Sequence, residues 1–135
     1  MFLLDTCAIS EGNRPVPEIA FDSWFAAQDQ SQLFLSAISV GEIRYGIDLL
    51  PLGRKRSALQ AWFDETVMVG FAGRVVSFEL KAALCWGDLR ARYPGAKMLD
   101  AQIAATALAT GLTLVTRNVK DFPFGGLQVL NPWRP

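Results

Sequence analysis

The chain has 135 residues, and its hydrophobic content of 51% is too high for an intrinsically disordered protein. Lys and Arg together number 13, as do Asp and Glu, so the net charge is zero. This balance excludes a strongly basic nucleic-acid-binding coat, although it allows a local basic patch. The sequence contains no histidine, which excludes histidine general bases, Ser-His-Asp and Cys-His nucleophiles, and metal sites that need histidine. Any hydrolysis must therefore depend on carboxylates, a metal ion or both.

The length fits one domain spanning residues 1–135. The two cysteines, Cys7 and Cys85, are too few for a disulfide framework or a tetrahedral zinc site. The N-terminal residues lack the pattern of a signal peptide, and no apolar run approaches the roughly 18 residues that span a bilayer. We expect a soluble, cytoplasmic protein that does not associate with a membrane.

Short apolar runs alternate with amphipathic segments along the chain. The pattern predicts strands at 2–4, 33–35, 74–76 and 112–115, with a further strand at 127–130. It predicts one or two helical turns at 6–11 and helices at 17–28, 39–50, 55–69, 78–93 and 98–110, the last of them closed by Gly111. This alternation indicates an α/β fold with a central, mainly parallel sheet of four to five strands.

Four acids are expected at the carboxyl edge of this sheet, where α/β proteins bind ligands. Asp5 directly follows the first strand, Glu42 lies one turn into the helix after the second, and Asp121 follows the fourth. Asp100 lies in the first turn of the helix that leads into the fourth strand, and that end of the helix also lies at the carboxyl edge. Clustered carboxylate oxygens favour Mg²⁺ or Mn²⁺.

Each of these acids also has a purely structural explanation. Asp5 is placed to cap the helical turns that follow it, and Ser39 and Glu42 have the spacing of a capping box. Asp100 has the position of an acid that complements a helix dipole. The remaining acids, Glu11 among them, are typical of solvated faces. One shared site explains the four acids at one edge better than four independent structural roles do.

Four segments carry a family resemblance. FLLDTCAIS, SVGEIRYGI, LDAQIAATAL and TLVTRNVKDF resemble, in order and spacing, the signature blocks of PIN-domain proteins. More narrowly, the chain is similar to VapC-type toxin ribonucleases, and its Asn131-Pro132-Trp133 is similar to the FitB-like branch. The resemblance implies a single PIN domain over residues 1–135 with a three-layer α/β/α fold.

The resemblance also implies an activity and its partners. It implies the toxin of a type II toxin–antitoxin system that hydrolyses RNA phosphodiester bonds with Mg²⁺ or Mn²⁺ and a water activated by the metal. The implied partners are a cognate antitoxin polypeptide, the RNA substrate and a second copy of the chain in a homodimer. Without histidine, such metal-assisted hydrolysis is also what the composition favours.

By this resemblance, Asp5 and Asp100 match the main metal ligands of the family, and Glu42 matches its helix glutamate. Asp121 matches the acid of the last block, although some relatives carry that acid where this chain has Asn118. All four acids are therefore expected to be catalytic, with Glu42 and Asp121 as possible further metal ligands. Either of these two is placed to orient the attacking water.

Other residues are expected to support the site. Thr6 and Thr116 match hydroxyls that flank the site of the family, whereas Cys7 departs from its pattern, in which Asn or Ser is more usual. A nuclease also needs phosphate contacts. Among the cations near the edge we expect Arg117 above all, with Arg44 and Lys120, to bind RNA.

Two other functions remain open from the residues. The first is a weakly active or inactive PIN module that serves mainly to bind the antitoxin in a DNA-binding repressor complex. The second is a phosphotransferase with Asp5 as nucleophile, which usually calls for a second Asp at the position of Cys7. For the antitoxin, we expect an apolar docking surface built from large side chains, namely Trp24, Phe25, Trp62 and Phe63.

Overall fold

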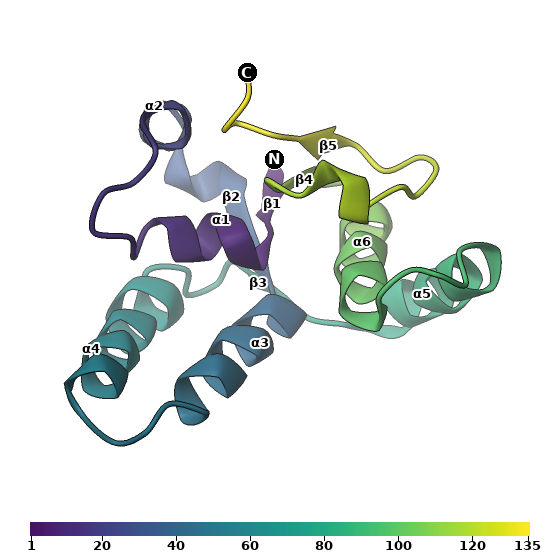
Figure 1. Cartoon of the computed structure of the whole chain (residues 1–135). Helices are drawn as coiled ribbons and strands as arrows, with labels where there is room; N and C mark the ends of the chain where they lie inside the picture. The colour runs from purple at the N-terminus through teal and green to yellow at the C-terminus, as the bar shows by residue number, and fades with distance from the viewer.

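The computed structural model describes all residues, 1–135, and centres on one sheet of five parallel strands. The strands are β1 (Phe2–Leu4), β2 (Leu33–Ser36), β3 (Val75–Val76), β4 (Thr113–Val115) and β5 (Val129–Leu130). Their order in the sheet is β3-β2-β1-β4-β5, so β1 lies in the middle and pairs with both β2 and β4. The carboxyl ends of these three strands therefore meet at one edge (Figure 1).

Helices fill the connections between the strands. They are α1 (Thr6–Glu11), α2 (Ile19–Ala26), α3 (Ala37–Asp48), α4 (Arg54–Trp62), α5 (Leu80–Arg92) and α6 (Met98–Thr110). Two single turns of 3₁₀-helix, η1 (Gln30–Gln32) and η3 (Val119–Asp121), and a π-helix, η2 (Phe63–Val69), complete the chain. Helices α1 to α4 and helices α5 and α6 lie on opposite sides of the sheet (Figure 1).

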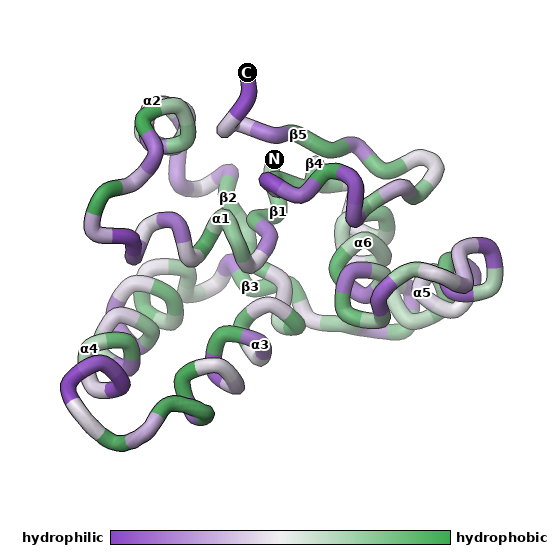
Figure 2. Tube along the Cα trace, in the orientation of Figure 1, coloured by the Kyte–Doolittle hydropathy of each residue, from purple (hydrophilic) through white to green (hydrophobic).

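The central strands are buried on both faces, as their continuous apolar sequences require. Leu4 and Val115 pack into a core formed with α1, α2, α3 and η2. Their neighbours Leu3 and Leu114 point the opposite way, into a core formed with α5 and the alanine-rich face of α6. This alternation produces the three layers, and Figure 2 shows the strands as mainly hydrophobic. No helix is long and apolar enough to cross a membrane.

The predicted α/β/α class and parallel sheet are confirmed, while several boundaries were wrong. Every predicted strand is present, and α6 ends before Gly111, whose φ of 70° is the left-handed conformation that glycine adopts readily. The helix predicted at 55–69 is α-helical only to Trp62 and continues as a π-helix. The helix predicted at 39–50 begins two residues earlier, at Ala37.

Candidate active site

Asp5 is the central side chain of the site, at the end of the middle strand. It is buried with 7% exposure and caps α1, because its Oδ1 accepts a hydrogen bond from the Thr6 backbone N–H at 2.6 Å. Its Oδ2 accepts a bond from the Thr116 hydroxyl at 2.7 Å, from the loop that follows the adjacent strand β4. Asp5 can therefore cap α1 and also serve in the site, and the two hydrogen bonds fix the orientation of its carboxylate.

Cys7 is a third donor to this carboxylate. Its Sγ lies 3.4 Å from Asp5 Oδ2, and it accepts the Arg117 backbone N–H at 3.5 Å. Burial, followed by the nearby Asp5 charge, raises the pKa of the Cys7 thiol to about 11. The thiol therefore stays protonated at neutral pH and can donate to Asp5, so the departure from the family pattern preserves a donor at this position.

Glu42 reaches the same site from α3. Its Oε1 accepts a hydrogen bond from the Thr6 hydroxyl at 3.2 Å. The predicted capping box is wrong, because Ser36 caps the helix through the Ile38 N–H at 3.1 Å. Ser39 lies inside the helix, fully buried, and its hydroxyl has no hydrogen-bond partner. Glu42 is therefore not engaged at the helix end, and its carboxylate is directed to Thr6 beside Asp5.

Asp100 and Asp121 complete the edge. Asp100 lies in the first turn of α6, as predicted, and Asp121 ends the 3₁₀ turn η3 that follows β4. Both line one surface pocket of 440 Å³. Burial, and then the charges of Asp121 and Asp5, raise the pKa of Asp100. Helix α6 and the turn after β4 therefore contribute one acid each to the same pocket.

The charges of Asp5 and Asp100 also affect the pKa of Glu42. Burial raises the pKa of Glu42, the bond from Thr6 opposes this, and the charges of Asp5 and Asp100 raise it further. The strand order places the four predicted acids at the carboxyl edge of the sheet. There Thr6 bonds to both Asp5 and Glu42, and Asp100 and Asp121 share a pocket. The oxygens of these acids are the ligand type that Mg²⁺ and Mn²⁺ prefer, and a divalent cation would relieve the repulsion between their charges. The donor set therefore fits such an ion in its chemistry, although no three acidic or thiol side chains converge tightly around one point.

The three predicted RNA-binding cations differ in their surroundings. Arg117 forms an ion pair with Glu18 and lies over the Trp133 ring, 5.8 Å from its centroid. Arg44 is exposed and paired with Asp48 at 3.1 Å. Lys120 is exposed and lines the same pocket as the acids of α6 and η3. Of the three, Lys120 combines a free charge with direct access to that pocket.

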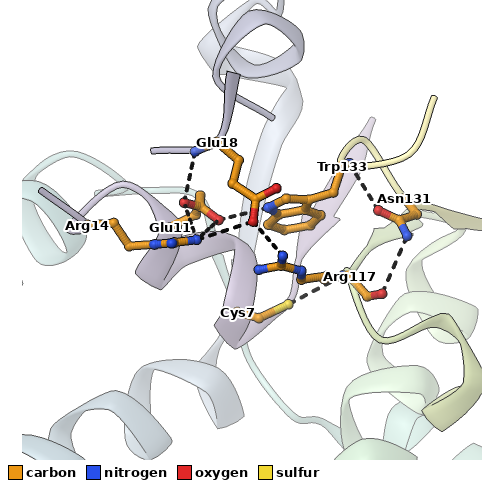
Figure 3. A network of polar contacts seen from close by, with 7 residues as sticks. All are labelled: Cys7, Glu11, Arg14, Glu18, Arg117, Asn131 and Trp133. Carbon is orange, nitrogen blue, oxygen red and sulfur yellow. Dashed lines mark hydrogen bonds and ion pairs between the residues drawn. The ribbon is translucent and has the colours of Figure 1, made fainter. Parts of the chain in front are cut away.

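Sequence reasoning missed a polar network that joins α1 to the end of the chain (Figure 3). Glu11, expected on a solvated face, is only 2% exposed and accepts the Trp133 indole N–H at 2.7 Å. Burial opposes its ionisation, yet the bonds from Trp133 and from the Glu18 N–H, with the charge of Arg14, lower the pKa of Glu11. No local pattern marks this role, because the indole donor is 122 residues away.

Comparison with known proteins identifies the family. The model of the PIN domain matches residues 2–123. The chain is 39% identical to VapC ribonuclease Y4jK of Sinorhizobium fredii over 139 residues, which cover 100% of this chain and 99% of the relative. It is 36% identical to Toxin FitB of Neisseria gonorrhoeae over 137 residues, covering 98% and 99%.

Solved structures agree with the sequence matches. The crystal structure of FitAcB from Neisseria gonorrhoeae superposes with a TM-score of 0.90 at 35% identity, covering 100% of both chains. A structure of FitAB bound to a DNA fragment gives a TM-score of 0.90 at 34% identity, covering 98% of this chain and 96% of the other. With its parallel five-stranded sheet and four acids at the carboxyl edge, the chain belongs to the PIN-domain family.

Proposed function

We propose that the protein is the toxin of a type II toxin–antitoxin pair, a ribonuclease that hydrolyses RNA phosphodiester bonds with Mg²⁺ or Mn²⁺. The observation that carries the proposal is the placement of Asp5, Glu42, Asp100 and Asp121 at one edge of the sheet, in a chain 39% identical to a VapC ribonuclease over its whole length. Because β5 and Trp133 complete the same sheet and core, we assign all of residues 1–135 to one PIN domain. Because RNA is the substrate, we propose that it acts in the cytoplasm.

In this proposal Asp5 and Asp100 are the main metal ligands, with Glu42 and Asp121 nearby. A bound divalent ion would supply charge neutralisation of the scissile phosphate and a more acidic water. The residues of the chain do the positioning. Thr116 and Thr6 fix the two oxygens of Asp5, and Glu42 or Asp121 orients the water whose oxygen attacks phosphorus as the P–O bond to the leaving oxygen breaks.

The substrate contacts that we propose are Lys120, Arg117 and Arg44. Lys120 adjoins the acids directly, so it is placed to meet a phosphate next to the cut. Arg117 and Arg44 are already paired with acids, so their contribution requires those pairs to open or to be shared with the phosphate. Asn118 leaves its side-chain amide free to support the same strand.

The cognate antitoxin is the proposed protein partner, in line with the FitAB complex among the relatives. An apolar groove of 290 Å³ runs between α1, α2 and η2, with Phe25 and Trp62 in its wall. Trp24 is also half-buried nearby, whereas Phe63, expected on this surface, is a core residue with 4% exposure. We propose that an antitoxin helix lies on this groove. A homodimer is also proposed, and light scattering of the purified protein tests it.

Whether the chain acts mainly as a DNA-bound partner rather than as an enzyme is decided by a cleavage assay. Purified protein should cut single-stranded RNA with Mg²⁺ or Mn²⁺ and stop in excess EDTA. Asp5→Asn and Asp100→Asn should each lower the rate at least about 100-fold, while the exposed, remote control Asp64→Asn should not. Activity that survives both EDTA and Asp5→Asn would refute the proposed chemistry. Growth arrest on expression, relieved by the antitoxin, tests the toxin role.

A further inference from the structure

A second pocket lies beside the acids, on the side of the C-terminal segment. It has a volume of 520 Å³, a size suited to a nucleotide-sized group. One wall is the loop after β4, from Arg117 to Lys120, and the other is the segment after β5, with Asn131, Trp133 and Arg134. The pocket is therefore built by the two segments that leave the carboxyl ends of neighbouring strands.

The charges of this pocket are mostly positive. Lys120 and Arg134 are exposed, and neither takes part in an ion pair of the chain. Arg117 is balanced by Glu18, the one acid in the lining. The net charge of the lining is thus two positive units, in a protein whose overall charge is zero. Such a local excess attracts a polyanion.

Lys120 connects this pocket to the acids. It lines both this pocket and the 440 Å³ pocket that contains Asp100 and Asp121. Lys120 therefore borders the acids on one side and the pocket that contains Arg134 on the other. Lys97, a further exposed and unpaired cation, lies in the acid-containing pocket. Exposed cations therefore line both pockets beside the acids.

Unlike Lys120 and Arg134, Arg117 is already paired within the chain. Its guanidinium pairs with Glu18 and lies over Trp133, while its backbone N–H bonds to Cys7 beside Asp5. Trp133 in turn donates its indole N–H to Glu11 (Figure 3). Its ring stacks on that of Phe21, with the ring centroids 4.5 Å apart. The network fixes the C-terminal segment, and hence the backbone that carries Arg134, against α1 and α2.

We propose that the pocket between the β4 loop and the C-terminal segment binds the phosphate backbone of the RNA strand next to the cut. Lys120 and Arg134 contact the phosphates directly, and Arg117 adds a contact when its ion pair with Glu18 opens. RNA is the occupant rather than the antitoxin because the lining is positively charged and Lys120 also lines the pocket that contains Asp100 and Asp121. This inference rests on the proposed ribonuclease function and names a binding subsite for its substrate.

Binding of a fluorescein-labelled single-stranded RNA, measured by fluorescence anisotropy in EDTA so that no cleavage occurs, tests the inference. Lys120→Gln and Arg134→Gln should each raise the Kd about five-fold and reduce the salt slope of binding by about 0.7. Glu18→Gln should act in the opposite direction and lower the Kd about three-fold, because it removes the one negative charge of the lining.

Matched controls lie elsewhere on the surface. Lys81→Gln on α5 removes an exposed, unpaired cation, and Glu65→Gln on η2 removes an exposed, unpaired acid. Both should bind RNA like the wild type. An Arg134→Gln protein that binds RNA as the Lys81→Gln control does would overturn the inference, as would an effect on antitoxin binding in place of RNA binding.

The two proposals fail in distinguishable ways. If the wild type cuts RNA with Mn²⁺ but Lys120→Gln and Arg134→Gln leave the Kd for RNA unchanged, the ribonuclease proposal holds and the subsite is refuted. A wild-type protein that binds RNA through these two residues but never cuts it supports the subsite and removes the proposed chemistry.

Discussion

Asp5 depends on its donors because a buried carboxylate needs them to hold its charge and its direction. The Thr116 hydroxyl is the one fully buried side-chain donor among them. Thr116→Val keeps the shape and removes the bond, so it should cost about 1–3 kcal/mol of unfolding free energy and lower RNA cleavage by letting Asp5 turn away. The measurements are a denaturant melt and the cleavage rate.

A matched substitution separates stability from function here. Thr106 is also fully buried, and its hydroxyl bonds to a backbone carbonyl within α6, away from Asp5. Thr106→Val should change stability while leaving the cleavage rate per folded molecule unchanged. Equal losses of activity in the two variants would mean that Thr116 contributes only to the fold.

Asp121 and Asn118 are two candidates for the position of the last-block acid. Asp121 lines the same pocket as Asp100, whereas Asn118 lines the neighbouring pocket. Asp121→Asn should therefore lower the cleavage rate much more than Asn118→Ala does, because a charged group is lost. Rates of both variants with Mn²⁺ decide it, and the reverse ranking would assign the family's acid position to 118.

Helix α3 begins earlier than the sequence predicted, and a different serine caps it. A cap typically contributes about 1 kcal/mol, and the structure gives this role to Ser36. Ser36→Ala should therefore destabilise the protein by about that amount. Ser39→Ala should cost little or be neutral, because it removes a buried hydroxyl that has no partner. Thermal melts of the two variants suffice, and the opposite order would restore the capping box at Ser39.

The elements that the sequence predicted well are those whose signal is local. The run Phe2-Leu3-Leu4 is apolar on both faces and can only be a doubly buried strand, and Gly111 marks a helix end by its own conformational freedom. The cap of α3 was misplaced because Ser39, with Glu42 three residues later, has the pattern of a capping box, whereas Ser36 has no acid at that position. The π-helical turn after Trp62 has no sequence signal that distinguishes it from the α-helix before it.

The candidate site could be proposed from the sequence for a related reason. Topology carries Asp5, Glu42, Asp100 and Asp121 to one edge, and topology follows from the order of strands and helices. Glu11 was missed because its burial depends on Trp133, which reaches it only after the whole sheet has formed. Contacts between residues this far apart leave no repeating pattern in the sequence from which they could be predicted. The sequence could therefore not predict the surface around the acids, including the pocket lined by Arg134, and only the structure shows it.

At the scale of the whole molecule, the four acids impose a cost on the folded protein that a cation offsets. Burial and neighbouring charges raise the pKa of Asp100, so its ionised form is disfavoured in the folded state at neutral pH. Asp100→Asn removes that charge and keeps the shape. In EDTA it should stabilise the protein by no more than about 1 kcal/mol, because the half-buried group is partly screened by solvent.

The pH and metal responses of the two proteins follow from the same charge. Because the pKa of Asp100 is raised, its penalty is present at neutral pH and disappears as falling pH protonates the carboxyl. The gap between the melting temperatures in EDTA should therefore shrink on acidification. Mn²⁺ at about 100 times its Kd should stabilise the wild type by roughly 2.7 kcal/mol and Asp100→Asn far less. If Asp100→Asn instead melts below the wild type in EDTA, Asp100 serves mainly the dipole of α6, and the metal site loses one of its two main ligands.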